Sequence, residues 1–443
     1  MISPVTSQLV FLELFFQLKE EPRSFSQLAS MGLLRRKLML LLLLVAFTFA
    51  AVIADASGED DNVDTWLKFM AETSGSDADP DYDAETDGTP ASGSHYENSF
   101  VTERDNHTPD GTKSEATANG MFVKFPKPKG KSRKITVSKF GKDDFITINA
   151  ALDSIAEHER HRTVIHIREG VYEEKIVINA SKPYITFRGD GLDKTIIQWG
   201  DQAGDFDDDD QMLKTYRSAT VGVSSQYFIA ENIQFRNTAP QPPPGAVLRQ
   251  AVALRITGDR AAFYNCAFYG FQDTLYDHKG RHYFENCYIQ GSIDFVFGNG
   301  RSLYKNCHLH SEAKVFGSVT AQKRNESHMN TGFSFVDASI TGRGPIYLGR
   351  AWGNFSRTVF SYTWMDNIVY PPGWSDFGFA DRQKKVFYAQ YNCRGPGAYS
   401  KERVAWVREL TAEEAKPFLS VHFINGKTWL KKFLGKSKKS KRH

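Results

Sequence analysis

The chain has 443 residues, of which 41% are hydrophobic and 24% charged, so it has the composition of a soluble globular protein with room for one large domain or two ordinary ones. This balance excludes a multi-span membrane protein. Residues 55–118 hold seventeen Asp and Glu against three Lys and Arg, which leaves everything after residue 118 near +15 although the whole chain carries only +3. A basic body fits nucleic acid, an anionic membrane or an acidic polysaccharide, and charge alone does not choose among them.

A basic and then apolar segment near the N-terminus predicts export. The basic stretch 35–37 precedes the apolar run 38–53, and the small residues 54–56 follow it, so residues 31–56 have the three regions of a secretory signal peptide. Residues 1–30 then lie upstream of the natural signal, as in an over-extended start. The alternative is an uncleaved signal anchor, although the run is shorter than the ~20 residues that a membrane span prefers.

Four glycosylation sequons are consistent with export. They begin at Asn106, Asn179, Asn325 and Asn354, and they matter only in a protein that is secreted. Each alone is weak evidence, because such tripeptides often arise by chance.

Composition divides the rest of the chain into segments. Residues 57–118 are rich in Asp, Glu, Ser, Gly and Thr and show no hydrophobic period, so they predict an acidic disordered linker. Residues 119–133 form a basic linker, and residues 431–443 form a basic tail. We therefore expect one folded domain over residues 134–430.

The domain begins with a strand and a helix and continues with strands. Residues 135–137 predict a short strand, and Asp143 or Asp144 is placed to cap a helix with four apolar residues on one face, Phe145, Ile148, Leu152 and Ile155. Short β-rich runs that end in Gly, Asn or Asp follow at 163–168, 175–178, 184–188, 195–198, 228–235 and 251–256. Near the C-terminus, Thr411 and Glu414 have the spacing of a capping box that opens a short helix.

The β-rich region repeats itself. The segments that end at Cys266, Cys287 and Cys307 share an aromatic-x-Asn-Cys pattern, with the cysteines 21 and then 20 residues apart, and looser copies surround Asn232 and Asp337. A period near 20 residues of short strands is typical of one coil of a parallel β-helix. We therefore predict an all-β protein, a right-handed parallel β-helix with short capping helices.

The repeat also predicts how the cysteines lie. Successive coils stack about 4.8 Å apart, which places Cys266, Cys287 and Cys307 in one inward ladder and the asparagines before them in a turn ladder. Three stacked thiols cannot all pair, so we expect small buried hydrophobic side chains. A Cys266–Cys287 disulfide is the alternative, since disulfides are the default in an exported protein.

Two aspartates share the repeat. Asp273 follows Cys266 by seven residues and Asp294 follows Cys287 by seven, so the two carboxylates stack if the cysteines do. Two carboxylates one coil apart cannot both ionise cheaply, and one pKa should rise while the other stays low. This pair can supply an acid and a nucleophile; the alternative is that both residues simply cap turns.

The surrounding polar residues favour catalysis. Gln272 precedes Asp273, and Gln250 lies 22 residues before Gln272, about one coil earlier, so two amide donors can meet a developing oxyanion. Structural amide ladders are the alternative. Arg350 can keep one aspartate ionised, and Trp352 offers a flat apolar face to a sugar ring.

Taken together, these residues resemble a known family. Five blocks, in family order, are similar to the signature blocks of plant pectin methylesterases over about residues 134–430: Gly170–Glu174, Gln250–Leu254, Gly270–Tyr276, Gly291–Gly298 and Leu348–Trp352. One block is weak evidence, whereas five in order are highly specific.

The resemblance implies an aspartyl esterase that removes methyl groups from the C6 esters of pectin in the cell wall. It implies that Asp294 is the nucleophile, that Asp273 is the general acid and then the base, and that Gln250 and Gln272 stabilise the oxyanion. It also implies substrate contacts by three further residues, Thr215, Arg350 and Trp352. No metal and no organic cofactor is required.

Two departures from the family pattern stand out. The last block usually reads Gly-Arg-Pro-Trp, and Ala351 here replaces the proline, which is expected to loosen Trp352. Many plant members also carry a long helical inhibitor-like pro-region with four cysteines, and residues 57–118 contain none. Self-inhibition through such a region is therefore not expected.

Several alternatives and partners follow. A polygalacturonase or pectate lyase would share the β-helix but needs a carboxylate trio or a calcium-binding cluster, and the acidic run Asp207–Asp210 lacks the glycine and ligand spacing of a calcium loop. A non-catalytic wall-binding protein is the non-enzyme alternative. We expect a secreted monomer that acts on pectin and can bind a proteinaceous inhibitor. We expect it to bind no nucleic acid and to have no stable membrane association.

Overall fold

The computed structural model describes residues 128, 130–141, 143–243 and 245–430. The expected upstream segment, signal peptide, acidic linker, basic tail and the sequon at Asn106 lie outside these described residues. Within them, no helix is long and apolar enough to cross a membrane.

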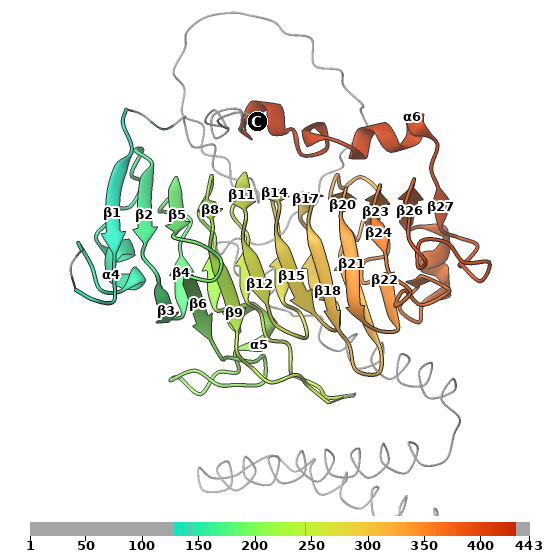
Figure 1. Cartoon of the computed structure of the whole chain (residues 1–443), viewed down its shortest axis with the longest axis horizontal. Helices are drawn as coiled ribbons and strands as arrows, with labels where there is room; N and C mark the ends of the chain where they lie inside the picture. Colours follow the sequence, from blue (N-terminus) through green and yellow to red (C-terminus); the bar gives the residue numbers. More distant parts are fainter. Residues whose placement is uncertain (1–127, 129, 142, 244, 431–443) are drawn as a thin grey trace, which may run out of the picture. The chain divides into compact units, whose positions relative to one another are not determined.

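The described chain winds through three parallel sheets (Figure 1). Sheet A contains β1 (Arg133–Val137), β2 (Thr163–Ile167), β5 (Ile185–Gly189), β8 (Ile229–Glu231), β11 (Ala261–Tyr264), β14 (Arg281–Glu285), β17 (Arg301–Lys305), β20 (Gly332–Val336), β23 (Arg357–Ser361), β26 (Phe387–Tyr391) and β27 (Arg408–Glu409). Sheet B contains β3 (Gly170–Glu173), β6 (Thr195–Trp199), β9 (Gln234–Asn237), β12 (Ala267–Tyr269), β15 (Tyr288–Gly291), β18 (His308–Glu312), β21 (Ser339–Arg343) and β24 (Trp364–Met365). Sheet C contains β4 (Ile176–Ile178), β7 (Val221–Val223), β10 (Leu254–Ile256), β13 (Leu275–Asp277), β16 (Val296–Gly298), β19 (Gly317–Gln322), β22 (Ile346–Arg350) and β25 (Trp374–Ser375).

From β2 to β25, each coil contributes one strand to each sheet, in the order A, B, C. The chain therefore forms a right-handed parallel β-helix, the hand that parallel crossovers adopt, and the fold predicted from the repeat is confirmed. Residues of successive coils are in register, as Phe263 pairs with Phe284 and Phe284 with Tyr304.

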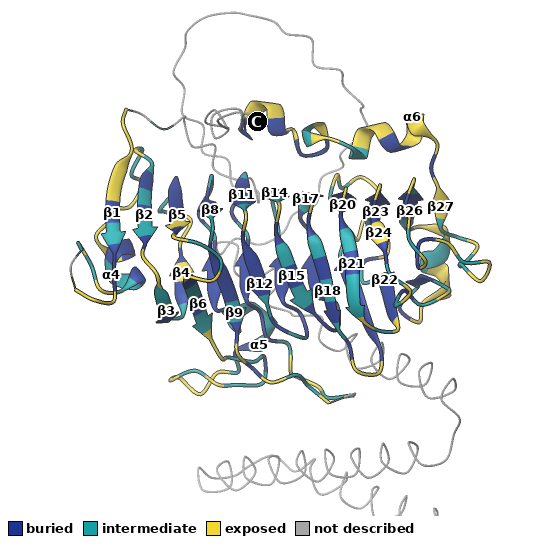
Figure 2. Cartoon of the chain, viewed as in Figure 1, coloured by how far each residue is buried: buried dark blue, intermediate teal, exposed yellow. Residues whose placement is uncertain are grey.

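Aromatic rings stack inside the helix along sheet A. The ladder contains Phe263, Phe284, Tyr304, Phe335 and Phe360, with ring centroids 4.5–4.7 Å apart and planes within 15° of parallel. All five rings are fully buried. Most residues of the strands are buried from one end of the β-helix to the other (Figure 2). A slip of one residue would turn this ladder outward, so the ladder fixes the register of the coils.

The corner between sheets A and B explains the repeated Asn-Cys pair. Asn265, Asn286 and Asn306 have φ of +49°, +55° and +52°, a left-handed conformation that asparagine tolerates better than most residues. Their side-chain amides hydrogen-bond from coil to coil, so the predicted asparagine ladder is confirmed.

The cysteine that follows each asparagine points into the core. Cys266, Cys287 and Cys307 are at most 2% exposed, which confirms their burial. All four cysteines are free thiols, so the alternative Cys266–Cys287 disulfide is absent. Cys393 occupies the same kind of corner after Asn392, a copy that the sequence pattern did not reveal.

Two local predictions were wrong in detail. The helix α4 (Ile148–Asp153) begins later than expected, and Thr147 caps it, because its hydroxyl accepts the N–H of Ala150 at 3.2 Å. Asp144 instead accepts the N–H of Thr136 at 2.8 Å. The run 228–235 is not one strand, because Asn232, with φ +57°, forms a corner between β8 and β9.

The C-terminal segment covers part of sheet A (Figure 1). The predicted capping box of Thr411 and Glu414 is confirmed and opens α6 (Ala412–Ala415). Short 3-10 helices follow, and residues Phe423 to Leu430 pack on outward side chains of β11, β14 and β17. The other short helices are α5 (Lys214–Arg217), η2 (Ala380–Lys384), η3 (Lys416–Phe418), η4 (Val421–Ile424) and η5 (Gly426–Thr428).

Candidate active site

Asp273 and Asp294 lie on adjacent coils, at the corner that leads into sheet C. The neighbouring residues Gln272 and Ile293 form a parallel bridge, and the N–H of Asp273 donates to the carbonyl of Ile293 at 3.0 Å. Leu275 pairs with Val296 two residues later, so the two aspartates are equivalent positions one coil apart. Their stacking, predicted from the equal offset to the cysteines, is confirmed.

Both aspartates also form the corner itself. Their φ angles are +64° and +48°, in the left-handed region where Asp is enriched. Capping a turn and lining a site are therefore compatible here. Asp273 is 9% exposed and Asp294 is 8% exposed, so the carboxyl groups are nearly buried but remain reachable from outside.

Asp294 is held by two donors from later coils. The Nε atom of Arg350, at the end of β22, donates to one carboxylate oxygen at 3.0 Å, and its Nη2 donates to the other. The hydroxyl of Ser318 donates to Asp294 and also accepts the N–H of Asp294, at 3.0 Å. An ionised carboxylate only accepts hydrogen bonds, and both donors of Arg350 and the hydroxyl of Ser318 donate to the oxygens of Asp294.

The electrostatics separate the two aspartates. Burial and then the charge of Asp294 raise the pKa of Asp273 well above its usual range, and Arg350 offsets this only in part. Burial alone would lower the pKa of Arg350, but the charge of Asp294 and the hydrogen bonds to it raise the pKa above its usual value. The two carboxyl groups therefore have unlike surroundings: Asp294 is paired with Arg350, and Asp273 is buried beside that charge.

The two glutamines lie near this corner but not in the same register. Leu254 pairs with Leu275, and the N–H of Ala251 donates to the carbonyl of Gln272 at 3.1 Å, so Ala251 stands beside Gln272 and Gln250 precedes that rung by one residue. The 22-residue spacing is thus one residue longer than the coil. The side-chain oxygen of Gln250 is buried without a hydrogen-bond partner among the described residues, so this amide does not belong to a structural ladder.

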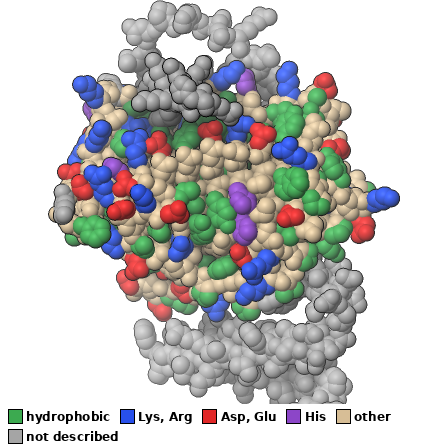
Figure 3. Space-filling model, viewed as in Figure 1, with side chains coloured by type: hydrophobic (Ala, Val, Ile, Leu, Met, Phe, Trp, Pro, Cys, Tyr) green, Lys and Arg blue, Asp and Glu red, His purple; other side chains and the backbone are tan. Residues whose placement is uncertain are grey.

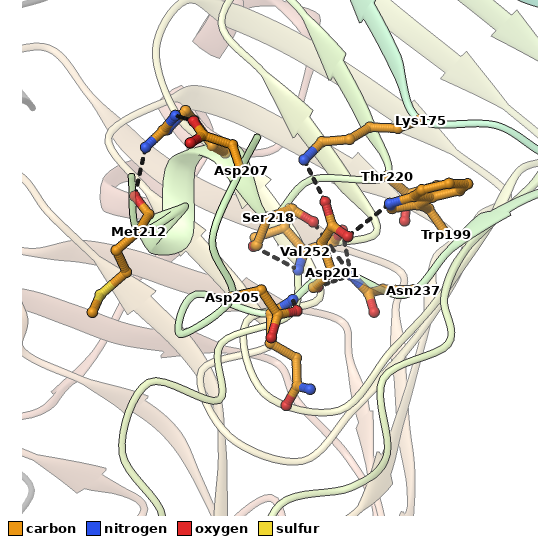
Figure 4. A network of polar contacts seen from close by, with 12 residues as sticks. Lys175, Trp199, Asp201, Asp205, Asp207, Met212, Ser218, Thr220, Asn237 and Val252 are labelled. Atoms are coloured by element: carbon orange, nitrogen blue, oxygen red, sulfur yellow. Dashed lines mark hydrogen bonds and ion pairs between the residues drawn. The ribbon is translucent and has the colours of Figure 1, made fainter. Parts of the chain in front are cut away.

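A buried asparagine ties the backbone near Gln250 to an inserted loop (Figure 4). The Asn237 amide nitrogen donates to the carbonyl oxygens of Asp201, at 2.8 Å, and of Val252, at 3.1 Å. The Asp201 carboxylate in turn binds Lys175 and accepts the indole N–H of Trp199 at 2.7 Å. This network positions the backbone two residues after Gln250.

The same loop carries Thr215 in the short helix α5. The Ser218 hydroxyl donates to the carbonyl of Thr215 at 2.9 Å. It also accepts the N–H of Val252 at 3.3 Å (Figure 4). The N–H of Ala203, at the start of the loop, donates to the carbonyl of Gln250 at 2.8 Å. Thr215 and Gln250 are therefore held to one rigid network.

Aromatic side chains pack on the outer side of sheet C. Tyr276 stacks on Phe297 with ring centroids 4.2 Å apart, and Trp352 lies 6.0 Å from Phe297. The Nζ atom of Lys323 lies 4.2 Å from the centre of the Trp352 ring. Tyr216, next to Thr215, packs against the same cluster, so the structure brings α5 and Trp352 to one surface.

Ala351 holds the chain beside Trp352. Its N–H donates to the carbonyl of Ser375 at 2.9 Å, and its carbonyl accepts a hydrogen bond from Arg382 at 2.6 Å. A proline could not make the first of these bonds. The backbone before Trp352 is thus anchored by a bond that the usual family residue lacks.

Ser318 is the site residue that sequence reasoning missed. Counting seven residues from Cys307 leads to Lys314, whereas the rung that follows Asp294 is Ser318, because the turn after β18 is longer than in the two earlier coils. The signal that could have located it is the strand Gly317–Gln322, aligned with Val296–Gly298.

The acidic run 207–210 has a structural role in the described residues. The carboxylate of Asp207 accepts the N–H groups of Asp209, at 3.2 Å, and Gln211, at 2.8 Å, and pairs with Arg217. These bonds brace the loop that leads into α5.

A parallel β-helix that carries two stacked, nearly buried aspartates, one of them ion-paired with an arginine, is consistent with a carbohydrate esterase. Comparison with known proteins agrees: the Pectinesterase family model matches residues 134–427. The chain belongs to the pectinesterase family.

Relatives and solved structures cover the same domain. Pectinesterase QRT1 of Arabidopsis thaliana is 48% identical over 301 residues, which are 68% of this chain and 79% of the relative, and Probable pectinesterase 8 of the same plant is 42% identical over 73% and 84%. The chain is similar to a pectin methylesterase from carrot (TM-score 0.63, 34% identity, 69% of this chain and 97% of that one). It is also similar to a pectin methylesterase solved in complex with a hexasaccharide (TM-score 0.58, 28% identity, 67% and 98%). The chain is therefore a carboxylic ester hydrolase that acts on pectin methyl esters.

Proposed function

We propose that Asp294 is the nucleophile and Asp273 the general acid and base of a two-step hydrolysis of galacturonate methyl esters. The observation that carries this assignment is the asymmetry of the pair: Arg350 and Ser318 both donate to Asp294, whereas burial next to that charge raises the pKa of Asp273. An ionised carboxylate can attack, and a neutral one can give a proton.

In the first step a carboxylate oxygen of Asp294 bonds to the ester carbonyl carbon, and the carbonyl becomes an oxyanion. The amide NH2 groups of Gln250 and Gln272 would donate to it, since Gln272 adjoins Asp273 and Gln250 lies close to Gln272 on the preceding coil. The tetrahedral intermediate then releases methoxide, which takes the proton of Asp273 and leaves as methanol. Asp294 remains as an acyl anhydride and Asp273 as a carboxylate.

In the second step Asp273 takes a proton from water, and the hydroxide attacks the acyl carbon. The bond to Asp294 breaks, its carboxylate is restored, and the galacturonic acid leaves while Asp273 is again protonated. Arg350 stays bound to Asp294 through both steps and stabilises it as leaving group. Thr215 and Trp352 line the surface that would receive the sugar rings.

Product analysis separates this function from the alternatives on the same fold. Purified protein and highly methylated pectin should yield methanol in proportion to new carboxylates, without unsaturated or reducing ends. Appearance of unsaturated ends would indicate a lyase, and appearance of reducing ends would indicate a polygalacturonase. Pectin binding with no product of any kind would indicate a wall-binding protein.

The location and assembly are also proposals. The signal-like residues 31–56 support export to the cell wall, and three sequon asparagines, Asn179, Asn325 and Asn354, are exposed and accessible to glycosylation. Mature protein from the wall should begin near residue 55 or 57 and carry N-glycans, whereas intact residues 1–54 would contradict export with cleavage. We expect a monomer by light scattering, with a proteinaceous inhibitor as a second partner besides pectin.

A further inference from the structure

Arginines gather at the corner where sheet C leads into sheet A. Arg301 opens β17, Arg357 opens β23, and Arg324 lies in the turn after β19. Gly332 opens the intervening strand, and a Cβ atom there would lie only 2.8 Å from Cδ of Arg357. The aliphatic stem of Arg357 therefore crosses the rung next to Arg301.

These guanidinium groups have no carboxylate partner among the described residues. The Arg301 guanidinium lies 5.5 Å from the centre of the Phe423 ring, and its Nε atom is buried without a hydrogen-bond partner among the described residues. Arg324 donates only to carbonyl oxygens, those of Ser327, Met329 and Phe355. By contrast, the neighbouring Arg281 is paired with Asp259 at 2.5 Å.

The arginine charges lower one another's pKa. Burial and then the charges of Arg324 and Arg301 lower the pKa of Arg357 to about 10. Burial and then the charge of Arg281 lower the pKa of Arg301. Stacking like charges on neighbouring coils costs stability, and an anion would offset this cost.

We propose that Arg301 and Arg357 form a subsite that binds the carboxylates of a demethylated stretch of galacturonan. Arg324 is satisfied by backbone carbonyls and adds positive potential without taking part in contacts. Guanidinium groups bind carboxylates in a bidentate geometry, and Phe423 forms an apolar wall beside Arg301.

The subsite is connected to the candidate active site through residues 322–324. The side-chain oxygen of Gln322 accepts the N–H groups of both Arg324, at 3.0 Å, and Arg357, at 2.9 Å. The next residue, Lys323, lies over Trp352 on the active-site surface. The carboxylates that the reaction creates would thus be attracted to the guanidinium groups of Arg301 and Arg357, across one corner of the β-helix. The enzyme would hold its own product while it acts on the adjoining esters.

Binding of unesterified oligogalacturonate, which contains no ester and cannot turn over, tests this proposal. Calorimetry on the full-length protein should show about tenfold weaker binding in Arg357→Gln and in Arg301→Gln. The matched control is Arg343→Gln, which removes the same charge from a side chain 70% exposed on sheet B and should bind as wild type. Equal affinities in Arg357→Gln and Arg343→Gln would overturn the subsite.

Two further measurements separate binding from folding and from catalysis. The urea midpoint of Arg357→Gln should equal or exceed that of wild type, since the mutation removes an uncompensated charge. A midpoint lowered as far as in Asp259→Asn, which breaks a true ion pair, would show that another part of the chain already pairs with the cluster and would refute the proposal. In Arg357→Gln, turnover of a methylated trimer should be unchanged, while KM for partly demethylated polymer should rise. A lower kcat on the trimer would place Arg357 in catalysis instead. The choice of polyanion rests on the proposed function, but binding of the unesterified oligomer remains measurable even if the catalytic roles fail.

Discussion

Replacing Arg350 by Gln should destabilise the protein far more than an ordinary surface change. Arg350 is 3% exposed and makes both of its hydrogen bonds to the carboxylate of Asp294, which is 8% exposed. Removing one partner of a buried pair leaves an uncompensated charge and costs about 3–5 kcal/mol. The loss should appear as a lower urea midpoint at pH 7 with an unchanged slope.

A double-mutant cycle isolates the pair. Asp294→Asn alone should also destabilise, because it leaves the buried guanidinium unpaired, whereas Arg350→Gln combined with Asp294→Asn removes both charges and should recover about 2–3 kcal/mol as coupling free energy. Arg382 is a matched control, since it donates to the neutral oxygens of Ala351 and Asn354. In the control, the losses of unfolding free energy in Arg382→Gln and Asp294→Asn should simply add. If the losses in Arg350→Gln and Asp294→Asn also add, Asp294 is not the charged partner of Arg350.

Three further predictions concern neighbouring groups. Ser318→Ala should lower kcat for methanol release about 10- to 100-fold, because a hydrogen bond to a charged group contributes about 1.5–3 kcal/mol. Ser318→Thr keeps the hydroxyl and should restore most of the lost kcat. A kcat within twofold of wild type in Ser318→Ala would contradict a role of Ser318 in holding Asp294. The pKa of Asp273 is raised in the folded state, so its contribution to stability is fully present below the unfolded value of about 3.9 and is lost as pH rises through the folded pKa. Asp273→Asn should therefore gain in urea stability over wild type as pH increases, and parallel pH profiles would argue against the raised pKa. Burial raises the pKa of the Cys266 and Cys287 thiols, so both should react slowly with a thiol reagent until urea unfolds the chain, and rapid labelling of native protein would contradict the inward stack.

The coil repeat could be predicted because two positions in each repeat accept few residue types. The corner into sheet B needs a left-handed residue followed by a small apolar one, and Asn-Cys meets both demands at residues 265–266, 286–287 and 306–307. The equal offset to Asp273 and Asp294 then located the centre of the site. Both inferences use short distances along the chain, and the offset of seven residues from cysteine to aspartate is the same in both coils.

The parts that sequence reasoning missed depend on turns of variable length or on local competition. Ser318 could not be located by counting, since the turn after β18 lengthens the coil by four residues relative to the cysteine spacing. Gln250 lies about one coil before Gln272, as expected, but the exact rung could not be read from the sequence, because the glutamine spacing exceeds the coil by one residue. Thr147 caps the helix, and Asp144 does not, because the Asp144 carboxylate accepts the N–H of Thr136 in the first strand. A local sequence pattern does not show this contact.

The most direct test of the account is to find which aspartate carries the acyl group. Asp273→Asn removes proton transfer but keeps the nucleophile, so rapid mixing with methylated oligogalacturonate should release residual methanol and leave an adduct that peptide mass analysis places on Asp294. Asp294→Asn should release no methanol above background and form no adduct. A covalent adduct on Asp273 in the Asp294→Asn protein, or near wild-type methanol release from that variant, would contradict the assignment of the two aspartates.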